Sequence, residues 1–219
     1  MKVRSLVLLS GGLDSAANLA LAVEQDLPVL AMTIRYGQRA EEAEVLAAEK
    51  LCRYYGVPHQ VIDARWLGEI SQSSLNKMDQ AVPQLKTSEL DQLDVIEKTA
   101  KAVWVPNRNG VFIHIAAAYA ESLKIDRVLL GFNSEEAVTF PDNSVEYLRA
   151  VNQALYFSTA NHVQVYSYTV AWNKKQIIQE LGKLKTRFPL EDVWSCYLGG
   201  PQACGMCESC KRLTRAIAT

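Results

Sequence analysis

A short glycine-rich stretch near the N-terminus combines residue types that bind phosphate. It consists of Leu9, Ser10, Gly11, Gly12, Leu13, Asp14, Ser15 and Ala16. Two adjacent glycines let the backbone turn tightly and direct successive N–H groups at one anion, and serine hydroxyls can donate to phosphate oxygens. Asp14 repels an anion, so we expect it to bind Mg²⁺ or to cap the following helix. A plain capped turn is the structural alternative. The stretch is not a Walker A loop, because G-x-x-x-x-G-K-[ST] occurs nowhere in the chain.

Four of the five cysteines gather near the C-terminus at a spacing typical of metal ligands. They are Cys196, Cys204, Cys207 and Cys210. Four thiolates at tetrahedral corners suit one Zn²⁺, and a site filled by four cysteines is closed and therefore structural. The alternative is an iron–sulfur cluster, because C-x2-C-x2-C also begins the bacterial ferredoxin run, although the C-x3-C-P that completes that run is missing. Their grouping at one end disfavours a disulfide framework.

The elements that must position the glycine-rich stretch alternate between strands and helices. A short apolar run at 3–9 predicts a buried strand that ends in the stretch itself. The next predicted elements are a helix at 15–25, a strand at 27–34, a helix at 40–55 and a strand at 57–63. This alternation favours an α/β fold with a Rossmann-like parallel sheet flanked by helices. Open sheets of this kind bind ligands at the carboxyl ends of their strands, where the stretch lies.

The second half of the chain is less regular. Residues 68–101 are polar, and we expect an irregular segment there, because loops of this length are typically lids, binding loops or disordered. Later predictions are a helix at 112–123, a strand at 127–132 that contains Gly131, a helix at 145–157, an extended segment at 163–170 and a helix at 174–184. We divide the chain into an α/β domain at 1–190, which carries the glycine-rich stretch, and a four-cysteine zinc-binding segment at 191–219.

The overall charge excludes a broad basic surface. The 219 residues include 23 Lys and Arg against 24 Asp and Glu, a net charge of −1, so we expect no nucleic-acid partner. The longest stretch without a charged residue, 150–173, contains too many Asn, Gln and His residues for a bilayer-spanning helix. Residues 1–9 are too short for a signal peptide and no cleavage site follows them. These features predict a cytoplasmic protein with no membrane partner.

The glycine-rich stretch matches the S-G-G-x-D-S signature of the PP-loop ATP pyrophosphatases. Together with the cysteine spacing, it makes the chain similar to the QueC family, the 7-cyano-7-deazaguanine synthases of queuosine biosynthesis. The resemblance covers essentially the whole chain. Further matching stretches are Tyr36-Gly37-Gln38-Arg39, Val57-Pro58-His59-x-Val61-Ile62-Asp63, Val105-Pro106-x-Arg108-Asn109, Phe140-Pro141-Asp142, Asn173-Lys174 and Ser195-Cys196-Tyr197.

The resemblance implies an ATP-dependent carbon–nitrogen ligase with small-molecule substrates. Such an enzyme converts 7-carboxy-7-deazaguanine and ammonia to the nitrile through adenylated intermediates, with AMP and pyrophosphate as expected products. The implied cofactors are Mg²⁺ with the ATP and one Zn²⁺, and the implied assembly is a homodimer. Residues 9–16 and Gly131 would bind the nucleotide. Asp14, Arg108 and Lys174 are the candidate catalytic residues, because the two cations can neutralise phosphate or a developing oxyanion; for each cation a structural role is the alternative.

Three stretches depart from the family pattern. Ala40 stands where the family commonly has His, Asn107 stands where it has Gly, and the clearest departure is at residues 135–144. Residues 135–144 read E-E-A-V-T-F-P-D-N-S, where the family commonly has an arginine and fewer acids. A diverged enzyme that passes the adenylated acid to another amine, such as a protein terminus, is therefore an alternative. A tRNA-modifying PP-loop enzyme and a non-catalytic nucleotide sensor or zinc-ribbon module are further alternatives.

Several aromatic residues and histidines have either a binding or a structural interpretation. Tyr36, Trp104 and Phe140 could stack on the purine-like base or belong to the core. For His59 and His114 we favour structural roles over general-base catalysis.

Overall fold

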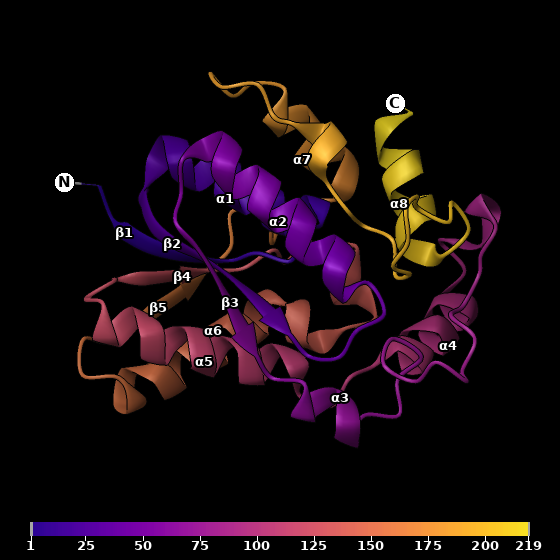
Figure 1. Ribbon diagram of the computed structural model, residues 1–219, viewed down its shortest axis with the longest axis horizontal. Helices are drawn as coiled ribbons and strands as arrows, with labels where there is room; N and C mark the ends of the chain where they lie inside the picture. The colour runs from indigo at the N-terminus through magenta and orange to yellow at the C-terminus, as the bar shows by residue number, and fades with distance from the viewer. Residues whose placement is uncertain (1, 219) are drawn as a thin grey trace.

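A five-stranded parallel sheet lies between two layers of helices in the computed structural model, which describes residues 2–218 (Figure 1). The strands are β1 (Arg4–Leu8), β2 (Leu27–Arg35), β3 (His59–Asp63), β4 (Arg127–Leu129) and β5 (Gln164–Tyr166), in the order β3-β2-β1-β4-β5. The predicted Rossmann-like α/β class is confirmed. Met1 and Thr219, the outer ends of the two expected domains, lie outside the described residues.

Helices cover both faces of the sheet and bury its apolar side chains. Helices α1 (Leu13–Gln25) and α2 (Glu41–Tyr55) lie on one face, and α5 (Arg108–Ser122) and α6 (Val145–Ser158) lie on the other (Figure 1). Successive residues of β1 point to opposite faces, so Leu6 packs with the α5 and α6 layer and Val7 with the α1 and α2 layer. Both side chains are fully buried. The two cores hold the carboxyl edge of the sheet in place.

The strand order reverses next to β1. The chain runs from β1 through β2 to β3 on one side, and then returns to place β4 and β5 on the other side. A crevice opens at such a reversal because the loops that follow the two central strands diverge. The glycine-rich stretch follows β1, and Gly131 follows β4. The topology therefore brings both predicted nucleotide-binding segments to the same crevice.

Part of the segment predicted to be irregular is helical. It contains α3 (Trp66–Ile70), a 3-10 turn (Thr87–Glu89) and α4 (Leu93–Val103). The prediction was wrong for α4, because Ile96, Ala100 and Val103 form one buried helical stripe within an otherwise polar sequence. The segment also packs against the cysteines, since the Leu85 N–H donates to the Met206 carbonyl at 3.1 Å. It therefore belongs to the folded body of the molecule.

The ends of several elements also differ from the predictions. Gly12 occupies the N-cap position of helix α1 and Asp14 lies inside its first turn, so the alternative in which Asp14 caps this helix was wrong. Helix α5 begins at Arg108, before the predicted start at 112. Strands β4 and β5 are three residues each, shorter than the predicted segments at 127–132 and 163–170; beyond β4, Gly131 packs against the backbone of Ser15. The remaining elements are 3-10 turns at Glu136–Val138, Pro141–Asn143 and Leu190–Asp192, helix α7 (Lys174–Leu181) and the unpredicted helix α8 (Glu208–Ile217).

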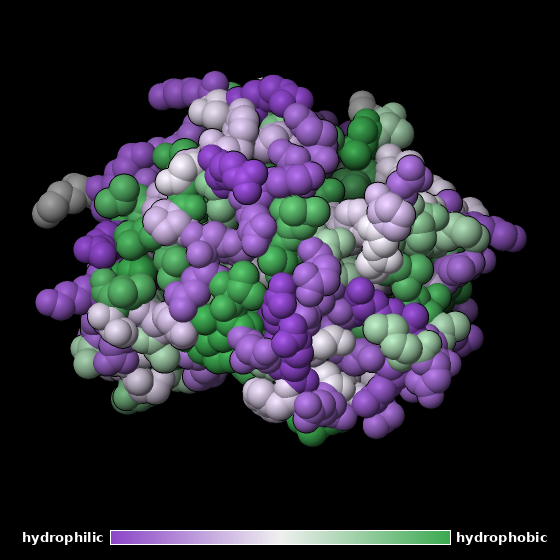
Figure 2. Space-filling view, viewed as in Figure 1, coloured by the Kyte–Doolittle hydropathy of each residue, from purple (hydrophilic) through white to green (hydrophobic). Residues whose placement is uncertain are grey.

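The surface gives no sign of a membrane span. Within residues 2–218, no helix combines the length and the apolar character needed to cross a bilayer. On the face drawn in Figure 2, hydrophilic side chains are interspersed with smaller hydrophobic areas.

Candidate functional site

A cavity of about 230 Å³ opens at the carboxyl ends of β1 and β4. Of the residues suggested from the sequence, its wall includes Leu9, Ser10, Gly12, Leu13, Asp14, Ser15, Arg108, Gly131 and Lys174. Gly11 and Ala16 are not among the described residues that line it. We call the part of the wall formed by Ser10, residues 12–15 and Lys174 the loop wall. The fold therefore gathers the predicted nucleotide and catalytic residues around one space, whereas their roles stay predictions.

Two glycines let the loop fit between its neighbours. Gly11 has a φ of +79°, and a Cβ on it would lie 2.8 Å from both the Ala47 Cβ and the Glu44 carbonyl oxygen of α2. A Cβ on Gly131 would lie 2.4 Å from the Ser15 nitrogen. Any larger residue at either position would displace the loop. The Gly-Gly turn is therefore held between α2 and the residues that follow β4.

The loop leaves the amino end of α1 facing the cavity. The Ser15 hydroxyl accepts the Ser10 N–H at 3.2 Å and donates to the Gly12 carbonyl at 3.1 Å, which fixes the turn. Helix α1 begins at Leu13, and its first-turn residues line the cavity. Its N–H groups and the positive end of the helix dipole favour an anion there. The loop wall is therefore suited to an anion such as phosphate.

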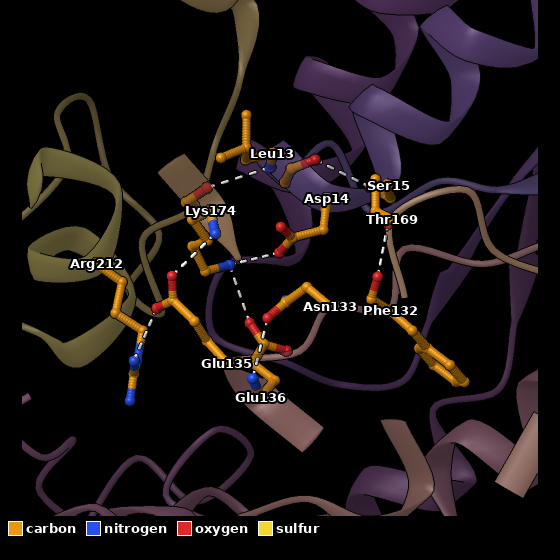
Figure 3. Close-up of polar contacts among 12 residues, drawn as sticks. Leu13, Asp14, Ser15, Phe132, Asn133, Glu135, Glu136, Thr169, Lys174 and Arg212 are labelled. Atoms are coloured by element: carbon orange, nitrogen blue, oxygen red, sulfur yellow. Dashed lines mark hydrogen bonds and ion pairs between the residues drawn. The ribbon is translucent and has the colours of Figure 1, made fainter. Parts of the chain in front are cut away.

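Lys174 forms a bridge between two acids in the loop wall. Its ammonium lies 2.5 Å from Asp14 Oδ2 and 3.0 Å from Glu136 Oε1, as Figure 3 shows. Burial raises the pKa of the Asp14 carboxyl to about 6, although Lys174 opposes the rise. Burial works against the charged form of Lys174, but Asp14 and Glu136 outweigh it and raise the pKa of Lys174. The ammonium is therefore charged at neutral pH.

The two acids fit a divalent cation. Asp14 Oδ1 is buried and finds no hydrogen-bond partner among residues 2–218. In spite of burial, Lys174 holds the pKa of Glu136 below its usual value, so a second ionised carboxylate faces the same space. Carboxylate oxygens are the ligands that Mg²⁺ prefers, usually together with substrate phosphates. The donor set therefore fits Mg²⁺ bound jointly by Asp14 and a nucleotide.

A second part of the cavity carries a carboxylate that sequence reasoning missed. We call it the second wall; it is lined by Tyr36, Gln38, Glu44, Arg108 and Phe112. Glu44 Oε2 accepts a hydrogen bond from Gln38 Nε2 at 2.8 Å, and burial raises the pKa of Glu44 to about 7. The Arg108 guanidinium lies 5.9 Å from the centre of the Tyr36 ring and lowers the pKa of Glu44. The second wall thus offers one acid, one cation and aromatic surface.

The aromatic candidates separate into two groups. Tyr36 lines the cavity and packs edge-on against Phe112, with ring centres 5.4 Å apart. Trp104 and Phe140 instead stack on each other at 6.1 Å, and neither is among the described residues of the cavity wall. Only Tyr36 of the three is thus placed to contact a base.

His59 and His114 make hydrogen bonds outside the cavity wall. His59 Nε2 lies 2.7 Å from the Thr33 hydroxyl, and burial lowers the pKa of His59. His114 Nδ1 lies 2.8 Å from the Gly110 carbonyl of its own helix. Neither ring is among the described residues that line the cavity. The structure therefore favours the structural interpretation for both.

The four C-terminal cysteines converge on one point. Their Sγ atoms all lie within 4.8 Å of one another, with Cys204 and Cys210 3.9 Å apart. Four sulfurs at Zn–S bond length around one tetrahedral ion are about 3.8 Å apart. Backbone N–H groups donate to Cys196 Sγ and to Cys204 Sγ, which holds both sulfurs in place. The cluster fits a single tetrahedral metal ion, as the spacing of the cysteines predicted.

Comparisons with known proteins support the same interpretation. The sequence profile of the family described as "Queuosine biosynthesis protein QueC" matches residues 4–219. A 7-cyano-7-deazaguanine synthase of Desulforamulus reducens is 52% identical over 215 residues, which are 98% of this chain and 93% of the relative. The same enzyme of Bdellovibrio bacteriovorus is 47% identical, over 98% of this chain and 92% of the relative.

A solved structure shares the fold. It is that of a 4-thiouridine synthetase in complex with RNA and bound ATP, with a TM-score of 0.52 and 14% sequence identity. The match covers 99% of this chain and 50% of that chain. At this identity the likeness shows the α/β architecture alone.

Proposed function

The chain belongs to the QueC family of queuosine biosynthesis proteins, and we propose on this premise that it is a 7-cyano-7-deazaguanine synthase. It converts 7-carboxy-7-deazaguanine, ammonia and two ATP into the nitrile, two AMP and two pyrophosphates. The substrate carboxylate attacks the α-phosphorus of ATP, and pyrophosphate leaves. Ammonia then displaces AMP to give the amide. A second ATP adenylates the amide oxygen, and loss of AMP with a proton leaves the nitrile.

The observation that carries the proposal is the pairing of the loop wall with the second wall in one cavity. The loop wall supplies backbone N–H groups, a helix amino end and Lys174, which together suit the outgoing pyrophosphate. The second wall supplies an acid, a cation and an aromatic ring, which suit a planar base with polar edges. Both reactants of the first step therefore find complementary groups in the wall of one cavity.

Lys174 has a defined task in this scheme. In the free protein its ammonium is neutralised by Asp14 and Glu136. When the nucleotide binds, the ammonium can turn from Asp14 to a phosphate oxygen, which frees the carboxylate for a cation. A bound Mg²⁺ would neutralise charge on the phosphates and make pyrophosphate a better leaving group. The exchange keeps every buried charge paired.

Glu44 and Arg108 suit the two polar features of the deazapurine acid. The base carries adjacent N1–H and 2-amino donors on one edge, and a carboxylate accepts both at once. Arg108 can pair with the carboxylate of the substrate and later with the oxyanion that forms when ammonia attacks. An adenine edge has an amino donor beside an acceptor nitrogen, so an ionised carboxylate suits it less well. We therefore assign Glu44 to the deazapurine.

The pH dependence of turnover tests this assignment. With saturating ATP, kcat/KM for the deazapurine acid should fall as the pH drops below about 7, because protonated Glu44 loses acceptor capacity. In Glu44→Gln this limb should disappear and kcat/KM should fall about 10²-fold, since an amide offers one acceptor and one unmatched donor. For an analogue of the acid that lacks the 2-amino group, kcat/KM should differ less between the wild type and Glu44→Gln. The exposed Glu49→Gln on the same helix is the control; an unchanged limb in Glu44→Gln would contradict the assignment.

The acids that depart from the family pattern do not alter the second wall. Glu135 is not among the described residues that line the cavity, and its carboxylate contacts Arg212 and Arg215 instead. Glu136 does line the cavity, but its carboxylate pairs with Lys174 in the loop wall. The two acids at positions 135 and 136 are thus accounted for by their pairing with cations of the chain itself. This supports ammonia as the acceptor over a larger amine.

The product mixture is the direct test of the function. The protein should convert 7-carboxy-7-deazaguanine to a product with the mass of the nitrile when ATP, Mg²⁺ and ammonium are present. AMP and pyrophosphate should accumulate at two equivalents per nitrile. Mass spectrometry of the base, with chromatography of the nucleotides, measures both. Formation of ADP and phosphate would overturn the adenylation scheme, and failure to consume the acid would overturn the substrate.

The four-cysteine segment completes the proposal. We assign Zn²⁺ to the cluster, because four close thiolates in a closed site suit this ion, and we give it a structural role. The homodimer and the cytoplasmic location stay predictions. The division into 1–190 and 191–219 also stays a prediction; its boundary falls in the 3-10 turn Leu190–Asp192.

A further inference from the structure

Glu135 joins two helices through its carboxylate. Oε1 accepts a hydrogen bond from the backbone N–H of Lys174, the first residue of α7, at 2.9 Å. Oε2 accepts hydrogen bonds from Arg212 at 3.0 Å and from Arg215 at 3.1 Å, both on α8. Figure 3 shows Glu135 between Lys174 and Arg212. One side chain thus connects the residue that holds the Asp14 carboxylate with the C-terminal helix.

The bridge is largely shielded from solvent. The exposed fraction of the side chain is 6% for Arg212 and 17% for Glu135. Arg212 is also bonded to Glu208 at 2.8 Å, and the second oxygen of Glu208 accepts the Thr99 hydroxyl of α4 at 2.8 Å. Ion pairs in such surroundings are screened little, and removal of one partner leaves an uncompensated charge. The loss of Glu135 should therefore affect both the backbone of Lys174 and the arginines of α8.

The cysteine segment meets the nucleotide loop by a second route. The Trp194 N–H donates to the Gly11 carbonyl at 2.9 Å, and the Leu13 N–H donates to the Ser195 hydroxyl at 3.4 Å. Both contacts lie directly before Cys196. The segment therefore contacts the loop on one side, while α8 reaches Lys174 through Glu135 on the other.

We propose that Glu135 is a positioning residue that makes ATP affinity depend on the placement of α8. Lys174 is held at both ends by adjacent residues, since Glu135 bonds its backbone and Glu136 bonds its ammonium. Arg212 lies two residues after Cys210 on α8, so the cysteine cluster determines where the guanidinium stands. A displacement of α8 would move the turn that holds Lys174. The inference rests on the proposed function only in taking ATP as the ligand.

Binding of an ATP analogue to Glu135→Ala tests the proposal. The probe is the α,β-methylene analogue of ATP with Mg²⁺, measured by isothermal titration calorimetry without any deazapurine. We expect the Kd to rise on the order of tenfold at wild-type metal content. In turnover, KM for ATP should rise while KM for the deazapurine acid stays unchanged. If Glu135 had only a structural role, Glu135→Ala would lower the melting temperature without raising KM for ATP relative to KM for the deazapurine acid.

Two further variants complete the experiment. Glu135→Gln should recover only part of the affinity, because its amide oxygen can still accept the Lys174 N–H but the amide carries no charge to pair with Arg212 and Arg215. Glu191→Ala removes an exposed acid paired with Arg187 and should leave the Kd unchanged. An unchanged Kd in folded Glu135→Ala, a Kd that rises only in proportion to lost metal, or a Gln variant that binds as tightly as the wild type would each overturn the proposal. Absence of binding by the wild type would instead contradict the proposed function.

Discussion

Replacement of Asp14 by asparagine should reduce turnover by a factor on the order of 10³ or more and leave the fold at least as stable as before. The activity should fall because the amide cannot supply the anionic oxygen that a divalent cation on the phosphates requires. Asp14 Oδ1 is a buried carboxylate oxygen that has no hydrogen-bond partner among residues 2–218, so its ionisation serves binding rather than the apo fold. The same substitution should therefore separate activity from stability.

The direction of the stability change follows from the pKa of Asp14. Burial raises this pKa to about 6, above the ordinary value of 3.8, even though Lys174 opposes the rise. The folded protein therefore binds more protons than the unfolded chain between these values, and Asp14 makes the protein less stable as the pH rises through this window. Asparagine does not titrate, and Lys174 keeps Glu136 as a partner. The variant should gain stability relative to the wild type from about pH 4 to pH 7.

Two measurements check this prediction. Denaturant unfolding at pH 4 and pH 7 compares the free energies of unfolding, and release of pyrophosphate measures turnover. Asp63→Asn is the control, because Asp63 is an exposed acid that pairs with Arg65 outside the cavity. Retained turnover in Asp14→Asn would remove the loop from the mechanism. A less stable variant at pH 7 would show that the bond to Lys174 outweighs the cost of burial.

The first three strands and two helices could be predicted because each is a continuous segment with one clear signal. Buried parallel strands are short apolar runs, and the helix that ends at Gly56 stops at a residue with φ of +66°. Helix α4 could not be recognised from composition, because a helix needs only one buried residue in three or four. Ile96 and Ala100 supply that stripe within a polar sequence. Strand β4 is too short to show a pattern of its own.

Some residues of the site could be recognised from a local motif, whereas the roles of others depend on partners that are distant in the sequence. The phosphate loop is a local motif, and its glycines could be recognised because a turn of this kind needs them. Glu44 gave no such signal, because acids in the first turns of a helix are favoured by the helix dipole and its role depends on Gln38 and Arg108. Glu135 differs again, since its partners on α8 lie far along the chain. Only the folded structure brings these groups together.

The second large effect should follow the loss of one cysteine ligand. Cys207→Ser should lose the metal and lower the melting temperature by on the order of 10 °C, because about 4 kcal/mol of lost metal binding corresponds to such a shift in a chain of this size. Cys207 caps α8, and its sulfur lies within 4.8 Å of the other three. A weaker ligand at this point leaves the helix without its anchor.

The consequences should extend beyond the cysteine cluster. Arg212 of α8 is buried and holds Glu135, and Ser195 accepts the Leu13 N–H of the nucleotide loop. A displaced segment would leave these groups unpaired, so affinity for ATP should fall together with stability. Metal analysis, differential scanning calorimetry and binding of the ATP analogue measure the three effects in one preparation.

Replacement of Cys52 is a control that distinguishes the effect of losing the metal from the effect of losing a thiol. Cys52 is buried between α2 and the sheet, outside the cluster, so Cys52→Ala should keep the wild-type metal content while losing some packing. Full metal content in Cys207→Ser would show that the fourth ligand is another group. Iron in the wild-type protein, together with a brown colour, would contradict the assignment of Zn²⁺ and would indicate an iron centre. In that case the four thiolates would still anchor α8, because the attachment depends on a bound ion and not on its identity.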